Sequence, residues 1–178
     1  MQEADLLVVL AEIAGVFVGF GALIAVRSGG PSDTSEVTYI RTVLSFGICV
    51  MVAGLTPVVL GGYDMSGHEL WLVCGLVGLV VFWGTMVVQA TAPENRAELA
   101  KAGRSEALRI ALGFWPFPLV ITGALVLVVL NPFPDQEAAL YLTAVEAGLY
   151  GAAAMLFMLV FGLGRPQTAD EEAEQPAE

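Results

Sequence analysis

The chain alternates between long apolar runs and short polar segments. A helix needs about 20 apolar residues to cross the hydrocarbon core of a bilayer. Runs of this length predict five membrane-spanning helices, at residues 6–26, 42–60, 70–88, 110–130 and 139–163. Glycine and proline residues, which end helices, separate the runs. The pattern therefore predicts an all-α membrane protein in which residues 1–165 form one bundle of five transmembrane helices.

The basic residues predict the orientation of this bundle. All seven lie in the first loop, in the third loop or after the fifth span: Arg27, Arg41, Arg96, Lys101, Arg104, Arg109 and Arg165. Cytoplasmic loops of membrane proteins are enriched in Lys and Arg. We therefore expect the N-terminus outside and the C-terminus in the cytoplasm. Residues 166–178 are acidic and poor in large apolar residues, so they are expected to form a disordered cytoplasmic tail.

The composition excludes several classes of protein. Only 14% of the residues are charged, whereas soluble domains carry about 25%. The net charge of −11 leaves no basic surface for a nucleic acid. We expect the lipid bilayer to be the main partner, in a bacterial or archaeal cytoplasmic membrane.

Two carboxylates lie inside predicted spans, Glu12 in the first and Glu146 in the fifth. A charge within a bilayer costs several kcal/mol, so such residues usually face protein or water and mark a function. Both lie roughly 10 Å below the outer edge of the hydrocarbon core, at 1.5 Å per residue. We expect them to turn inward and meet at one level, with at least one carrying a proton at neutral pH.

Small and hydroxyl-bearing residues accompany these carboxylates. Gly15 and Gly19 share a face with Glu12, and the fifth span has the same spacing of small residues at Ala144, Gly148 and Ala152. Small residues four apart let helix backbones approach closely, which predicts that these faces pack. Hydroxyl groups expected near the carboxylates come from Thr143, Tyr150 and Thr122.

Two interpretations of the glutamates stay open. In the first, they form a proton or cation pathway through a channel or transporter. In the second, they tie helices or subunits together in a non-catalytic scaffold or accessory subunit. Five helices leave little room for a tunnel, so a homo-oligomer or a complex with other membrane subunits is expected. The chain lacks phosphate-binding and catalytic motifs, so we expect neither an enzyme nor a cofactor.

Prolines fall within two spans. Pro57 lies in the second, and Pro116 and Pro118 lie in the fourth. Proline in a span frees a backbone carbonyl and can kink the helix. These three residues are therefore candidate hinges.

The predicted second loop, which lies on the outer side, holds three polar residues close in sequence, Asp64, His68 and Glu69. Their spacing matches no strong metal-ligand signature, so we expect a solvated loop and no metal. Aromatic residues near the outer ends of spans, among them Tyr141, are typical of the aromatic belt of membrane proteins.

Overall fold

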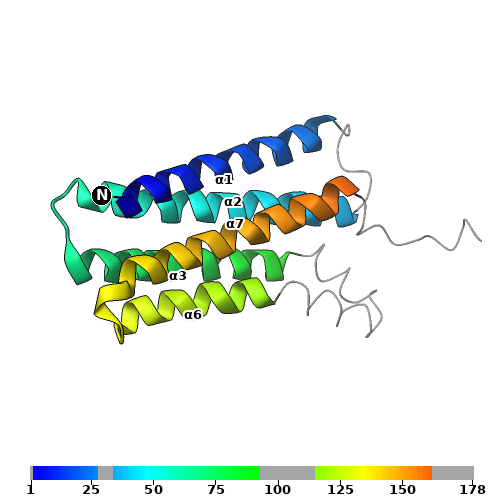
Figure 1. The fold of residues 1–178 in the computed structure, drawn as a ribbon. Coiled ribbons are helices and arrows are strands. Elements are labelled where there is room, and N and C mark those ends of the chain that lie inside the picture. The colour runs from blue at the N-terminus through cyan, green and yellow to red at the C-terminus, as the bar shows by residue number, and fades with distance from the viewer. Residues whose placement is uncertain (1, 28–33, 93–114, 162–178) are drawn as a thin grey trace, which may run out of the picture.

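The computed structural model describes residues 2–27, 34–92 and 115–161. Their regular structure is entirely helical, which confirms the predicted all-α class. The elements are α1 (Gln2–Arg27), α2 (Thr34–Gly61), α3 (Gly67–Thr91), α6 (Pro116–Leu130), the short 3-10 helix η1 (Pro134–Gln136) and α7 (Glu137–Phe161). Consecutive long helices run in opposite directions along one bundle (Figure 1).

Four of the described helices are long and apolar enough to cross a membrane. They are α1, α2, α3 and α7, with mean hydropathies of 2.4, 2.3, 2.2 and 1.8 over their apolar stretches. The 15 residues of α6 form a shorter apolar helix, about 22 Å long at 1.5 Å per residue. Residues 110–114 of the predicted fourth span and 162–163 of the predicted fifth span lie outside the described residues, as does the predicted tail 166–178. The fold is thus compatible with a multi-pass membrane protein.

Helix α7 is the common partner of the other described helices. It contacts α1, α2, α3 and α6, whereas α1 packs mainly on α2 and α7. In Figure 1, α7 crosses the front of the bundle and α1 lies along one side. The core between α2, α3, α6 and α7 is apolar and includes Phe46, Phe82, Ile121, Leu125 and Val145. The cavity among these side chains measures about 30 Å³, so the interior of the bundle is closely filled.

The close contact between α1 and α2 depends on glycines of α2. A Cβ atom on Gly54 would lie 2.7 Å from the carbonyl oxygen of Leu7, and one on Gly47 would lie 3.3 Å from that of Ala14. By contrast, nothing lies within 4 Å of the Cβ position of Gly19, and Gly15 meets only the Sδ atom of Met51 at 3.9 Å. Within the single chain, Gly15 and Gly19 therefore do not form the close helix contact expected of them. Gly47 and Gly54 of the partner helix α2 form it instead.

The small residues Ala144, Gly148 and Ala152 lie on the buried side of α7. Ala144 and Ala152 are buried. A Cβ atom on Gly148 would approach the Cγ2 atom of Val50 in α2 to 2.9 Å. This face of α7 packs against the centre of the bundle because it carries little side-chain volume.

One end of the bundle is rich in acidic residues, and we call it the acidic end. There α1 begins, the connection from α2 to α3 turns, and α6 is followed by η1 and the start of α7 (Figure 1). Asp5, Asp64, Glu69 and Asp135 are exposed at this end. Arg41, an exposed base, lies near the opposite end of the bundle, in the first half of α2.

Candidate functional site

The two glutamates expected to meet lie on the outside of the bundle. Glu12 of α1 and Glu146 of α7 are both exposed. Glu12 lies two positions before the buried Ala14, and Glu146 lies two positions after the buried Ala144. Two positions on an α-helix correspond to a rotation of about 200° around the helix axis. Because the small alanines occupy the packing faces, the carboxyl groups point away from them. Among the described residues, no hydrogen bond joins the two carboxyl groups, so the inward orientation expected from the sequence is not found in the single chain.

Glu146 shares its exposed surface with two hydroxyl groups. Thr143 and Tyr150 lie three and four residues from Glu146 on α7, and all three side chains are exposed. Thr143 donates a hydrogen bond to the carbonyl oxygen of Ala139 at 2.8 Å, within its own helix. We call the surface formed by Thr143, Glu146 and Tyr150 the Glu146 face. It is a polar stripe on a helix of mean hydropathy 1.8.

Thr122 lies away from this face. It belongs to α6, which packs on α3 and α7, whereas Glu12 belongs to α1, which packs mainly on α2 and α7. The Thr122 Oγ1 atom is buried, with no hydrogen-bond partner in the described part of the chain. The structure therefore does not group Thr122 with either glutamate.

A side chain from another helix binds the backbone of α2 near the candidate hinge Pro57. Pro57 lies inside α2 and has no N–H group, so it cannot donate to the carbonyl oxygen four residues earlier, that of Ala53. The Tyr141 hydroxyl of α7 donates to this oxygen at 2.8 Å. Tyr141 is fully buried and packs against Trp71, with ring centroids 5.6 Å apart. This partner restores the missing hydrogen bond and ties α2 to α7.

The other two prolines stand at the beginning of a described helix. Pro116 is the first residue of α6 and Pro118 the third. Proline is well tolerated in a first turn, where the N–H groups have no helical acceptor. Within the described residues, Pro116 and Pro118 thus start α6 and do not interrupt it, although the predicted part of the span before Trp115 lies outside them.

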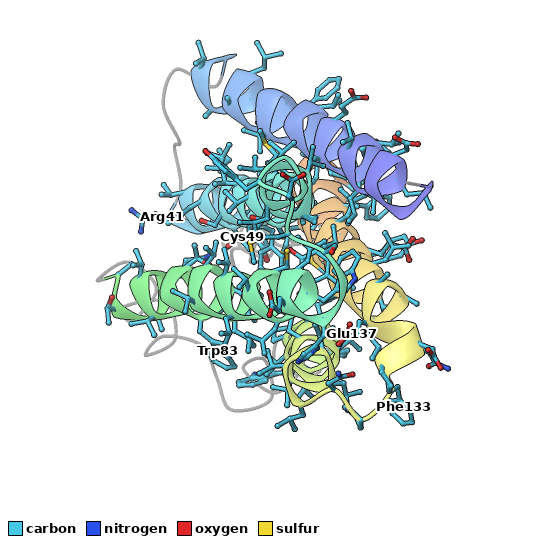
Figure 2. All side chains as sticks on the ribbon, turned by 90° about the vertical axis from the view of Figure 1, so that its left-hand side faces the viewer. Arg41, Cys49, Trp83, Phe133 and Glu137 are labelled. Atoms are coloured by element: carbon cyan, nitrogen blue, oxygen red, sulfur yellow. The ribbon has the colours of Figure 1, made fainter. Side chains whose placement is uncertain are left out.

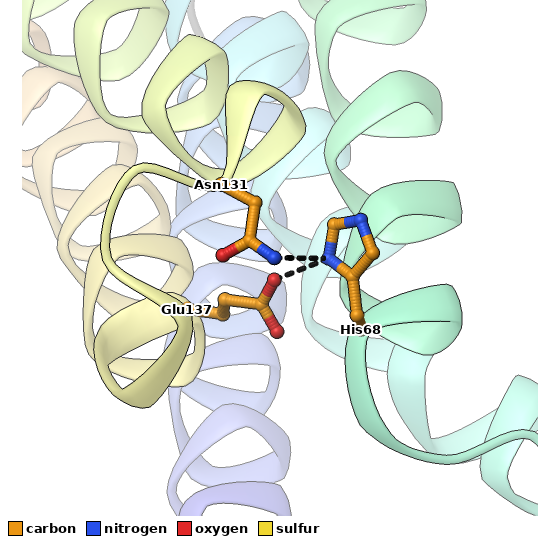
Figure 3. A network of polar contacts seen from close by, with 3 residues as sticks. All are labelled: His68, Asn131 and Glu137. Carbon is orange, nitrogen blue, oxygen red and sulfur yellow. Dashed lines mark hydrogen bonds and ion pairs between the residues drawn. The ribbon is translucent and has the colours of Figure 1, made fainter.

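A polar network joins three elements at the acidic end (Figure 3). His68, near the start of α3, is paired through its Nδ1 atom with Oε1 of Glu137, the first residue of α7. The Nδ2 atom of Asn131, which follows α6, lies 3.1 Å from the same ring nitrogen. The Glu137 side chain is 6% exposed and the His68 side chain 42%. The network therefore combines a buried carboxylate with an imidazole that solvent can reach.

Sequence reasoning missed two members of this network. It grouped His68 with Asp64 and Glu69, but both acids are exposed and neither has a described contact with the ring. Glu137 and Asn131 are more than 60 residues away in sequence. The sequence signal for Glu137 was its position as an acid two residues before the predicted fifth span, at the outer end of that span. No group of three His, Cys, Asp or Glu side chains suited to a metal occurs among the described residues.

A second polar region lies toward the opposite end, between α2 and α3 (Figure 2 labels Arg41 and Cys49 of α2). The Thr42 hydroxyl donates to Oε1 of Gln89 at 3.1 Å, and Sγ of Cys49 lies 3.3 Å from Oγ1 of Thr85. A pocket of about 420 Å³ opens here; its lining residues are Arg41, Ser45, Thr85, Val88, Gln89, Thr91 and Ala92. Polar side chains are thus concentrated at the two ends of the bundle and on its outer surface, with the apolar core between them.

Comparison with known proteins gives no assignment for these sites. No family model, curated protein or solved structure matches the chain.

Proposed function

We propose that the chain is an integral membrane protein, with its N-terminus outside, that assembles with copies of itself through the Glu146 face. We further propose that this contact between copies forms a pathway for protons or small cations. The proposal is supported by four long apolar helices with a shorter fifth and by the distribution of polar groups on their surface.

The exposure of Glu146 is the observation that carries the proposal. An ionisable group in a membrane span is costly unless it faces protein or water. Glu146 lies in the middle of the apolar helix α7 but points away from the rest of its own chain. A second protein surface over the Glu146 face would remove the carboxyl group from lipid.

The chemistry of the Glu146 face suits a second copy of the same face. Glu146 supplies acceptor oxygens, while Thr143 and Tyr150 supply hydroxyl groups that both donate and accept. In a two-fold symmetric contact the same patch on both subunits must be self-complementary. A face with donors and acceptors three and four residues apart on one helix meets this condition.

The polar pairs described between α2 and α3, Thr42–Gln89 and Cys49–Thr85, contain no carboxyl group. Phe46 and Phe82 meet edge to face at the centre of the bundle, with ring centroids 6.0 Å apart, and the cavity beside them measures about 30 Å³. A path for protons or cations is therefore better supplied by the surface between copies. There, Glu146 could exchange a proton with the hydroxyl groups beside it.

Glu12 favours the second candidate function, a scaffold or accessory subunit. It is exposed on α1, and no described hydrogen bond connects it with the Glu146 face. A single protonated carboxyl group can tie two subunits by a hydrogen bond worth about 0.6–2 kcal/mol in model systems. In this alternative, both glutamates hold subunits together and conduct nothing.

The two functions are separated by flux and assembly measured on the same samples. Purified protein in liposomes is assayed for proton and cation flux, and its oligomeric state is measured by cross-linking in the same bilayer. The variants are Glu146→Gln and Glu12→Gln, and Glu69→Gln serves as a control because Glu69 is an exposed acid at the acidic end. We expect the parent protein and Glu69→Gln to conduct, and Glu146→Gln to remain oligomeric without conducting.

Other results assign the protein differently. A parent protein that forms oligomers but carries no flux, with both glutamine variants dissociating, would support the scaffold. A parent protein that stays monomeric in bilayers would contradict self-assembly through the Glu146 face and the pathway proposed there.

A further inference from the structure

One nitrogen atom of His68 faces two groups that require opposite states of that atom. Nδ1 is paired with the carboxylate oxygen of Glu137, and the amide nitrogen of Asn131 lies 3.1 Å away. A ring nitrogen carries either a proton, which it can donate, or a lone pair, which can accept. Glu137 as a carboxylate needs the proton, whereas the Asn131 Nδ2 group, itself a donor, needs the lone pair.

The charge state of the imidazole decides which neighbour is bound. In the protonated ring both nitrogens are donors, so Nδ1 donates to Glu137 and repels the amide N–H of Asn131. In the neutral ring with its proton on Nε2, Nδ1 has a lone pair and accepts from Asn131. Figure 3 shows both groups aimed at the same nitrogen.

We propose that His68 is a proton-operated switch that binds the start of α7 when protonated and the end of α6 when neutral. Histidine changes charge between about pH 5 and 8, and the half-exposed ring is open to protons from solvent. Asn131 ends α6 in a left-handed conformation, with φ of 50°, and Glu137 is the first residue of α7. The switch therefore acts on both ends of the connection 131–136.

Among the described titratable groups near this end, Glu137 is the acid in contact with the His68 ring. Exposed groups come from α1, the α2–α3 connection, α3 and η1: Asp5, Tyr63, Asp64, Glu69 and Asp135. None of them has a described contact with His68. Tyr141 of α7 is buried, and its hydroxyl donates to Ala53. The inference does not depend on the proposed pathway, because it concerns contacts within one chain.

The experiment follows the imidazole nitrogens by NMR over a pH range of about 4.5–9, which brackets the titration of histidine. His68 is the only histidine in the chain, so labelling of the full-length protein with ¹⁵N-histidine in detergent micelles gives a single pair of ring signals, and ¹⁵N-asparagine labelling reports the side-chain amide of Asn131. We expect the neutral ring to carry its proton on Nε2. We also expect the side-chain amide signal of Asn131 to shift with the same midpoint as the ring.

Two variants and a control test the partners. In Glu137→Gln we expect the Nδ1 signal of the protonated ring to change, because the carboxylate that accepts from Nδ1 is gone. In Asn131→Ala we expect the neutral ring to populate both tautomers. Glu69→Gln, which changes the neighbouring exposed acid, is expected to leave the Nδ1 signal unchanged.

Two results on the parent protein would overturn the switch without any variant. One is a neutral ring that carries its proton on Nδ1. The other is an Asn131 amide signal that does not follow the ring. An Nδ1 signal equally displaced in Glu137→Gln and Glu69→Gln would also contradict it, since a general charge effect would then explain the response.

Discussion

The hydroxyl group of Tyr141 donates to the carbonyl oxygen of Ala53, the acceptor that Pro57 leaves without a helical donor. A proline in a membrane helix is tolerated when another group satisfies the freed carbonyl. Here that group comes from α7, 88 residues away in sequence. Pro57, a candidate hinge from its sequence position, therefore lies beside a hydrogen bond that joins α2 to α7.

Replacing Tyr141 by phenylalanine should leave the partly buried Ala53 carbonyl without a hydrogen-bond donor. We expect the free energy of unfolding to fall by about 1–3 kcal/mol, the range for a buried polar group that loses its partner. In a Pro57→Ala background the loss should be smaller, because alanine at this position restores the helical N–H donor. Unfolding in detergent measures both, with Tyr63→Phe as an exposed control. Equal losses in the two backgrounds would show that the Tyr141 hydroxyl does not take the place of the N–H donor that Pro57 lacks.

Two glycines that look alike in sequence should respond differently to alanine. In Gly54→Ala the new methyl group meets the Leu7 carbonyl oxygen at 2.7 Å, and overpacking of this kind costs about 1–3 kcal/mol. In Gly19→Ala it meets nothing within 4 Å, so stability should be unchanged or slightly higher, since alanine favours helices. Thermal unfolding of the two variants side by side tests this difference. If Gly19→Ala destabilised the monomer, another helix would have to pack against position 19.

Thr122→Val should not weaken the fold. The Thr122 hydroxyl is buried without a partner in the described residues, and an unsatisfied buried polar group costs about 1–3 kcal/mol. Valine keeps the shape and removes that cost, so we expect equal or higher stability, and unchanged flux if the pathway follows the Glu146 face. Loss of flux with intact stability would instead support the role that the sequence predicted for Thr122.

Two phenylalanines allow the core to be compared with the surface. Phe46 is 2% exposed and lies at the centre of the bundle, whereas Phe157 of α7 is 53% exposed. In the proposed membrane protein, lipid is as apolar as the core, so the cost of Phe46→Ala comes mainly from the cavity that remains. We expect a loss of roughly 2–3 kcal/mol, below the roughly 3–5 kcal/mol usual in soluble proteins. In an unfolding titration, Phe157→Ala should change the unfolding free energy of the monomer by less than half as much.

The sequence could predict the helices because length and hydropathy alone determine them. Every predicted span overlaps a described helix, although residues 110–114 are not described. Which face of a helix is buried was harder to predict, because lipid and core both favour apolar residues. Gly15 and Gly19 have the spacing of a packing motif, yet the contact depends equally on the partner helix, where Gly47 and Gly54 provide it.

The polar contacts between distant residues were beyond the sequence for a different reason. Tyr141 fits an aromatic belt at the membrane surface, and only the position of α2 shows that its hydroxyl has an acceptor in another helix. His68 and Glu137 are 69 residues apart, and their pairing requires the turn after Asn131 to bring α7 beside α3. Neither relationship leaves a periodic pattern in the chain.

The position of α7 as the common partner also has a consequence for biosynthesis. Among the long helices described, its residues are the last to leave the ribosome, yet α1, α2, α3 and α6 all contact it. In the proposed membrane protein, the Ala53 carbonyl lacks its donor until α7 inserts, and the packing surfaces of α2 and α6 face lipid or the insertion machinery until then. Truncation before Glu137 should therefore yield helices that enter the membrane but are degraded rapidly, because the helix that joins them is missing.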